Sequence, residues 1–219
     1  MTRALLVIDV QNDFTEGGAL GVDGGAAVAA GISRLLAGHR SEYDLVVASR
    51  DWHDGDNDNG GHFASGEAPD YIDTWPVHCV AGTAGAEYHP DLATDGIDVH
   101  VKKGQGRPAY SIFEGTTEDG RSLPEVLRAR GVTDVDVVGI ATDYCVRASA
   151  LDAVADGERV RVLTDLVAGV APGTSDAALA ELRHAGVETV PGTAVPAPAV
   201  TVTRALPAVT ASSLSLIHI

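Results

Sequence analysis

The chain has 219 residues, enough for one domain with a full hydrophobic core. Its formal net charge of −16 argues against nucleic-acid binding, because phosphates are neutralised by Lys and Arg side chains. No apolar run approaches the roughly 20 residues that span a bilayer, and no signal peptide precedes the first apolar stretch. Two cysteines do not make a disulfide framework in a chain of this length. We therefore expect a cytoplasmic protein that binds neither membrane nor nucleic acid.

Short apolar runs in chain order indicate strands, and most are too continuous for a strand with one face in water. They cover residues 4–9, 44–49, 97–101, 135–140, 159–163 and 187–190. Helical patterns lie between several of them, at 25–39, 122–131, 143–157 and 174–186, the last with Thr174 or Ser175 as its expected cap. This alternation predicts a three-layer α/β domain of the Rossmann-like kind, with a mostly parallel central sheet flanked by helices.

Two stretches depart from this rhythm. Residues 50–96 form a long Gly-, Asp- and His-rich excursion that holds several of the few aromatic residues, which favours a functional loop over a disordered one. We expect the domain to cover residues 1–192 and a Pro-, Ala-, Val- and Thr-rich tail to cover 193–219. The final LSLIHI (214–219) is the in-frame translation of a sequence that resembles a transposon-end adapter, which predicts a sequencing or gene-assembly artefact.

Chemically capable side chains follow the predicted strands, at the points where the strands end. Asp9 ends the first strand, Asp51 and His53 follow the second, Lys103 follows the third and Cys145 follows the fourth of the inner strands. Because sites in open parallel sheets form at the carboxyl ends of the strands, these side chains are expected at one edge. An acid, a metal-binding pair, a titratable cation and a thiol would then share one site.

Cys145 lies at the predicted start of a helix, where the unpaired N–H groups and the macrodipole favour a thiolate. A nearby Lys would lower the thiol pKa further, and the alternative is a small buried core residue. Cys79 has no such placement, so we interpret it as structural.

Asp9 ends an apolar run, where a buried carboxyl must be paired or have a raised pKa, as a general base requires. The alternative for Asp9 is a carboxylate that caps a loop through backbone N–H groups. Asp13 lies closer to the turn and is interpreted as structural.

Asp51 and His53 form a D-x-H pair. His62 follows nine residues after His53, and His78 follows sixteen residues after His62. A carboxylate with imidazoles suits a Zn, Fe or Mn ion, and a set of three leaves coordination positions open for catalysis. Isolated surface histidines are the alternative.

Seven fragments in series carry a family resemblance: DVQNDF, SRDWH, HF, WPVHC, VKKG, AYSIFEG and GIATDYCV. Together, from about residue 3 to 190, they resemble the nicotinamidases of the isochorismatase-like cysteine hydrolases. The resemblance implies a parallel sheet between helical layers. It also implies hydrolysis of nicotinamide to nicotinate and ammonia in NAD salvage.

By position, the resemblance makes Asp9, Lys103 and Cys145 a catalytic triad, with Cys145 as the nucleophile and Asp9 as the proton acceptor. It implies an oxyanion hole built from the N–H groups of Ala141 and Cys145, preceded by a cis peptide bond between Ile140 and Ala141.

The resemblance also implies one divalent metal ion, bound by Asp51, His53 and His78, that positions the substrate ring. His62 is a further ligand only if the loop bulges, since nine residues separate it from His53 where the family has about six. Phe14 and Trp75 would enclose the ring with Tyr110 nearby, although core packing is the alternative for each.

Several other functions are compatible with parts of the pattern. The nearest is another hydrolase of the superfamily, acting on isochorismate, a carbamoyl compound or another small amide. A second is hydrolysis by metal-activated water without a covalent intermediate, and a third is a binding module with a vestigial site. A homo-oligomer is compatible with the sequence in every case.

Overall fold

The computed structural model describes residues 2–66 and 68–194, so most of the expected tail, including residues 214–219, lies outside the described residues. A seven-stranded sheet runs in the order β4-β3-β2-β1-β5-β6-β7. Its strands are β1 (Arg3–Ile8), β2 (Leu45–Asp51), β3 (Val99–Lys103), β4 (Thr116–Thr117), β5 (Asp134–Ile140), β6 (Arg159–Ala168) and β7 (Glu188–Val190). Only β3 and β4 pair antiparallel, which confirms the predicted mostly parallel sheet.

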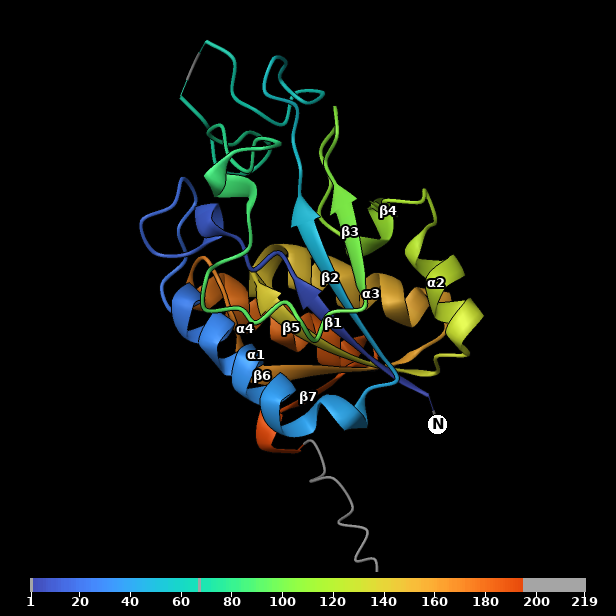
Figure 1. Cartoon of the computed structure of the whole chain (residues 1–219). Helices are drawn as coiled ribbons and strands as arrows, with labels where there is room; N and C mark the ends of the chain where they lie inside the picture. Colours follow the sequence, from blue (N-terminus) through green and yellow to red (C-terminus); the bar gives the residue numbers. More distant parts are fainter. Residues whose placement is uncertain (1, 67, 195–219) are drawn as a thin grey trace, which may run out of the picture.

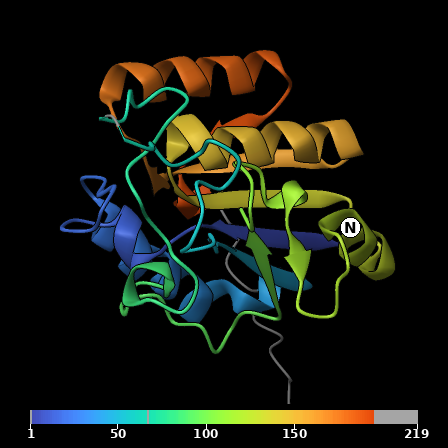
Figure 2. The same cartoon turned by 90° about the horizontal axis from the view of Figure 1, so that it is seen from above.

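Helices cover both faces of the sheet, as Figures 1 and 2 show. They are α1 (Gly25–His39), α2 (Leu123–Arg130), α3 (Arg147–Asp156) and α4 (Pro172–His184). Strand β1 alternates between the two cores, with Leu5 in the core that contains α1 and Leu6 in the core that contains α2, α3 and α4. Burial of each such side chain contributes about 1.5–3 kcal/mol, so every central strand is held from both sides. Within the described residues, no helix is long and apolar enough to cross a membrane.

Two predicted helices differ from the structure at their first turns. The segment predicted as one helix over 143–157 is a π-helical turn, Thr142–Val146, that continues into α3. Helix α4 begins at Pro172, so the expected cap at Thr174 or Ser175 is wrong. Proline is well suited to the first helical turn because its missing N–H would have no helical partner there.

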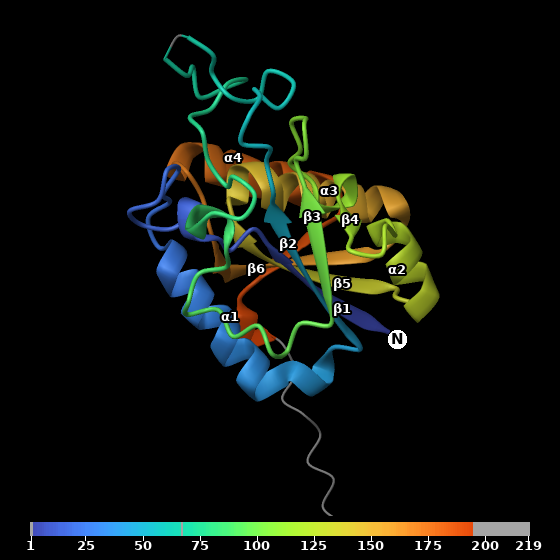
Figure 3. The same cartoon turned by 45° about the horizontal axis from the view of Figure 1, so that its top comes forward.

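The first part of the long loop between β2 and β3, drawn in teal, lies beyond the carboxyl ends of the strands, and the last part, drawn in green, runs back to the start of β3 (Figure 3). The loop is ordered by isolated bridges, which pair His53 with Val80 and Phe63 with Trp75. Within this loop the sequence DGDNDNG, residues 54–60, forms a bulge. Asn59 closes the bulge, because its Oδ1 accepts from the N–H groups of Asp54 at 2.9 Å and Gly106 at 3.1 Å. This loop carries His53, His62, Trp75 and His78, four of the predicted site residues.

We predict that Gly139→Ala destabilises the fold far more than Gly157→Ala. Both glycines have φ in the left-handed half of the map, +120° and +113°, which alone costs about 1–3 kcal/mol for alanine. At Gly139 a Cβ would also lie 2.1 Å from the Ile8 carbonyl oxygen, whereas at Gly157 it meets no atom within 4 Å. Urea unfolding should show at least about 3 kcal/mol more loss for Gly139→Ala. Equal losses in the two variants would contradict this account.

Candidate active site

The sheet register brings the predicted side chains to one edge. Asp51 ends β2 and pairs in register with Lys103, the last residue of β3. Asp9 directly follows β1, and Cys145 lies in the π-helical turn after β5. The predicted convergence at the carboxyl ends of the strands is therefore what the fold produces.

Lys103 is fully buried and stands at the centre of this group. Its Nζ lies 2.9 Å from Asp9 Oδ2 and 3.8 Å from Cys145 Sγ, and it donates to Asp51 Oδ1. Burial alone would lower the pKa of Lys103, but the carboxylates of Asp51 and Asp9 raise it well above its usual value. Lys103 is thus a fixed cation between the other groups.

Asp9 has an unusual backbone conformation, and its two carboxylate oxygens have different partners. The backbone φ of Asp9 is +46°, in the left-handed region that residues other than glycine rarely adopt. The Ser49 hydroxyl donates to Asp9 Oδ1 at 2.7 Å and accepts from the Asp9 N–H at 3.3 Å. Oδ2 is left without a hydrogen bond of good geometry, facing Lys103. Ser49 was not predicted, although its place two residues before Asp51 on the same strand is a signal that could have found it.

Burial raises the pKa of Asp9, an effect that Lys103 opposes only in part. Burial likewise raises the pKa of the Cys145 thiol well above its usual value, despite the Lys103 ammonium. The lowering of the thiol pKa expected at a helix start is therefore wrong in direction, and attack by Cys145 calls for a base. A carboxyl with a raised pKa is suited to that work.

The two residues interpreted as structural have structural contacts. Cys79 is fully buried, and burial raises the pKa of its thiol. Asp13 Oδ2 accepts from the Cys79 N–H at 2.7 Å, so these residues tie the turn after β1 to the loop that follows His78.

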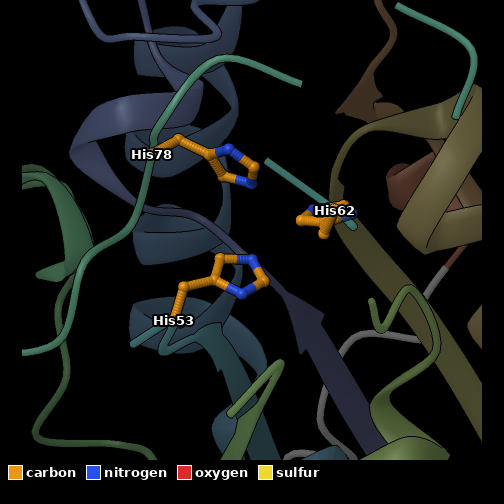
Figure 4. Close-up of side chains that lie close together, drawn as sticks. All are labelled: His53, His62 and His78. Carbon is orange, nitrogen blue, oxygen red and sulfur yellow. The ribbon is translucent and has the colours of Figure 1, made fainter. Parts of the chain in front are cut away.

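His53, His62 and His78 form a buried cluster whose ligand atoms all lie within 4.8 Å of one another. Figure 4 shows the three rings around a common space. Burial lowers the pKa of His62 to about 3 and also lowers the pKa of His78, so both rings are neutral and can act as ligands. Asp51 Oδ2 lies 3.6 Å from His53 Nε2 and 3.9 Å from His78 Nε2.

The chemistry of this cluster fits a metal ion. His53 Nδ1 bonds to the Gly104 carbonyl at 2.7 Å and His78 Nδ1 to the Pro76 carbonyl at 2.8 Å, which fixes both rings with Nε2 available. His53 Nε2 and His62 Nδ1 are buried without a protein partner, although such atoms are normally satisfied. A divalent cation is the group that would satisfy them, and the charge of Asp51 favours it.

The bulge closed by Asn59 explains how His62 reaches this cluster. The His62 backbone N–H donates to the Asn59 carbonyl at 3.4 Å, and the His62 carbonyl accepts from the Trp75 N–H at 2.9 Å. The extra residues after His53 are thus folded into the bulge, so that His62 lies beside the other imidazoles.

A cavity of about 390 Å³ joins the reactive groups. Its lining includes the predicted Phe14, Trp75, Tyr110, Ala141 and Cys145, as well as Val22, Tyr144 and Val170, which were not predicted. The Trp75 Nε1–H donates to the Tyr110 hydroxyl at 3.1 Å, so the two rings hold each other at the cavity wall. The peptide bond between Ile140 and Ala141 is cis, as predicted.

Comparison with known proteins agrees with this site. The model of the isochorismatase domain matches residues 3–193. The chain belongs to the isochorismatase family. A nicotinamidase/pyrazinamidase from Mycobacterium tuberculosis is 54% identical over 188 residues, which cover 86% of this chain and 98% of that protein.

Two solved structures of the same fold carry ligands that bear on the site. PnC1 from L. infantum in complex with nicotinate has a TM-score of 0.76 and 36% identity, covering 88% of this chain and 94% of that one. The pyrazinamidase of Pyrococcus horikoshii in complex with zinc has a TM-score of 0.73 and 36% identity, covering 87% and 99%. The three-histidine cluster with Asp51 gives this isochorismatase-family chain a site for one divalent metal ion.

We predict that His53→Ala and His78→Ala each weaken metal binding at least about tenfold, the lower limit seen even for groups that only support metal ligands. His62→Ala should weaken it as well, since its ring completes the buried cluster. His89→Ala serves as the control, because His89 lies outside the cluster. Zinc, iron and manganese content after dialysis against graded chelator measures the effect. A His62→Ala protein that retains metal as well as His89→Ala would remove His62 from the ligand set.

Proposed function

We propose that this chain is a metal-containing cysteine amidohydrolase that converts nicotinamide to nicotinate and ammonia. The observation that carries the proposal is that one cavity is lined by the Cys145 thiol, by Asp51 of the metal cluster and by the aromatic rings of Phe14, Trp75 and Tyr110. The relative named nicotinamidase/pyrazinamidase and the related structure with nicotinate support the same substrate class.

The cavity accounts for recognition of a flat heteroaromatic amide. Phe14 and Trp75 offer ring faces, and Tyr110 is held beside Trp75 by a hydrogen bond. Asp51, His53, His78 and His62 would hold the metal ion, which would act as a Lewis acid that orients the substrate by its ring nitrogen. Phe14 also lies against His78, with 5.5 Å between ring centroids, so ring binding and metal binding adjoin.

Acylation starts from a neutral thiol. Asp9 Oδ2 accepts the Cys145 proton as Sγ attacks the amide carbon, while Lys103 remains protonated beside both groups. The N–H groups of Ala141 and Cys145 would stabilise the oxyanion. Collapse of the tetrahedral intermediate breaks the C–N bond, and Asp9 returns the proton to the departing amine. The amine leaves as ammonia, and the acyl group remains on Cys145 as a thioester.

Deacylation uses the same groups in reverse. Asp9 accepts a proton from a water molecule that attacks the thioester carbon, and the C–S bond breaks to release nicotinic acid, which loses its carboxyl proton to solvent and becomes nicotinate. The proton passes back to Sγ and restores the resting thiol. Since the Lys103 ammonium lies beside both Asp9 and Cys145, it balances the negative charge whether that charge is on the Asp9 carboxylate or on the Cys145 sulfur.

The same proposal includes the wider setting. We propose a cytoplasmic role in NAD salvage, a catalytic domain covering residues 1–192 followed by a tail at 193–219, and assembly into a homo-oligomer. Size-exclusion chromatography with light scattering tests the assembly, and full-length and 1–192 chains compared for ammonia release test the domain boundary.

We predict that Cys145→Ala lowers ammonia release from nicotinamide at least about 10³-fold, the scale seen when a covalent nucleophile is removed. Cys79→Ala is the matched control, because Cys79 is an equally buried thiol without a predicted role. Glutamate dehydrogenase-coupled ammonia detection measures the rate, and mass spectrometry of quenched parent enzyme should find the acyl group on Cys145 alone.

The other outcomes separate the alternatives. Equal release by the parent and Cys145→Ala would mean that metal-activated water drives hydrolysis. A folded, metal-loaded parent that releases no ammonia from nicotinamide would direct the search to other small amides, carbamoyl compounds and isochorismate.

A further inference from the structure

The π-helical turn that carries Cys145 is bound to a neighbouring segment through the side chain of Asp143, a residue of the turn. The turn spans Thr142–Val146, and no side chain caps its start. Asp143 lies two residues before the nucleophile, and its carboxylate is directed to the segment between β6 and α4.

Two backbone donors from that segment and one hydroxyl from the first turn of α4 converge on Asp143. Its Oδ1 accepts from the Val170 N–H at 3.0 Å, and its Oδ2 accepts from the Ala171 N–H at 3.4 Å and from the Thr174 hydroxyl. Helix α4 starts at Pro172 without a side-chain cap from its own cap residue. Because the first N–H groups of a helix have no helical partner and carry partial positive charge, a carboxylate there is stabilising.

The backbone is shaped for this contact. A Cβ added at Gly169 would lie 1.9 Å from the Ser175 hydroxyl oxygen and 3.1 Å from Asp143 Oδ1. The absence of a side chain at Gly169 therefore lets the segment approach both groups closely without displacing them. The next residue, Val170, lines the cavity although its side chain is 55% exposed, so this segment forms the outer wall of the site.

A second contact between the same elements provides a comparison. Arg147, the first residue of α3, donates from Nε and Nη2 to the two carboxylate oxygens of Glu181 on α4, both at 2.6 Å. This pair joins α3 to α4, and neither of its residues lines the cavity. Asp143 is the connection that joins the nucleophile turn directly to the cavity wall.

We infer that Asp143 is a positioning residue: its carboxylate fastens the turn that carries Cys145 to the Val170 segment, and so sets the nucleophile against the outer wall of the cavity. The inference rests on the proposed cysteine mechanism. A displacement of about 1 Å at a reacting atom can lower a rate by about 10²-fold, so loss of this fastening should act on the chemical step. Ring binding, which depends on Phe14 and Trp75, should change little.

Asp143→Ala tests this inference against Asp143→Asn and Glu181→Gln. We expect Asp143→Ala to lower kcat for nicotinamide at least about tenfold, with KM within about threefold of the parent. Asp143→Asn should keep kcat within about threefold, because its amide oxygen can still accept from the Val170 N–H and the Thr174 hydroxyl can turn to accept from its NH₂. Glu181→Gln weakens the other contact to α4, because it removes the carboxylate charge and one of the two acceptor oxygens, and it should leave kcat unchanged.

A second measurement does not depend on nicotinamide as the substrate. The rate of Cys145 alkylation by iodoacetamide, followed by peptide mass spectrometry, should change at least about threefold in Asp143→Ala and not in Glu181→Gln. If the parent releases no ammonia but this difference persists, the proposed function fails and the positioning role stands.

The inference is overturned if Asp143→Ala keeps kcat and the alkylation rate within twofold of the parent. It is also overturned if Asp143→Ala and Glu181→Gln lose activity in the same proportion to their loss of melting temperature, which would indicate a structural role only. If Asp143→Ala does not fold, Asp143→Ser decides, because its shorter side chain has one hydroxyl in place of the two carboxylate oxygens that accept from the Val170 N–H and the Thr174 hydroxyl. A loss of kcat of at least about tenfold at unchanged KM then supports the fastening. A parent-like kcat together with a parent-like alkylation rate overturns it.

Discussion

The site depends on a buried ammonium group shared by two carboxylates. An unpaired ammonium in the interior would cost several kcal/mol, so Lys103 can be buried only because Asp9 and Asp51 both reach it. Asp9 belongs to the proposed catalytic triad, and Asp51 lies beside the three-histidine cluster. Lys103 therefore links the nucleophilic half of the site to the ring-binding half. Although burial would raise the pKa of Asp51, the Lys103 charge and the neighbouring histidines hold that pKa well below its usual range, which keeps a charged ligand ready for a cation.

This arrangement changes how the cysteine works. Burial and the nearby carboxylates raise the pKa of the Cys145 thiol, and the Lys103 ammonium opposes this only in part. The attack must then be coupled to proton transfer, which requires a base within reach and a raised pKa. Asp9 meets both requirements because Ser49 occupies Oδ1 and leaves Oδ2 for the proton.

The sequence predicted the sheet, its parallel sense and the edge at which the site forms, because apolar runs and the residues that end them are local properties. Asp9, Asp51, Lys103 and Cys145 were identified in this way, and the family resemblance supplied their roles. The sequence did not reveal Ser49 or Asp143, because their importance lies in contacts between segments far apart in the chain. The thiol pKa was also mispredicted, since burial and the charges of neighbouring strands decide it and no local pattern records them.

The choice of Lys at position 103 follows from the same constraint. The chain has only two lysines, Lys102 and Lys103, among fifteen basic residues, so the cation at this position is not the residue that its composition favours. Lys102 lies on the surface side, with Nζ 4.2 Å from the Trp52 ring centroid. Lys103 must serve Asp9, Asp51, Cys145 and the Ala109 carbonyl from one point. A compact ammonium with three rotatable donors can do this, whereas the planar guanidinium of Arg favours side-by-side pairing with a single carboxylate and needs more room. The geometry of the buried carboxylates thus determines the residue between them.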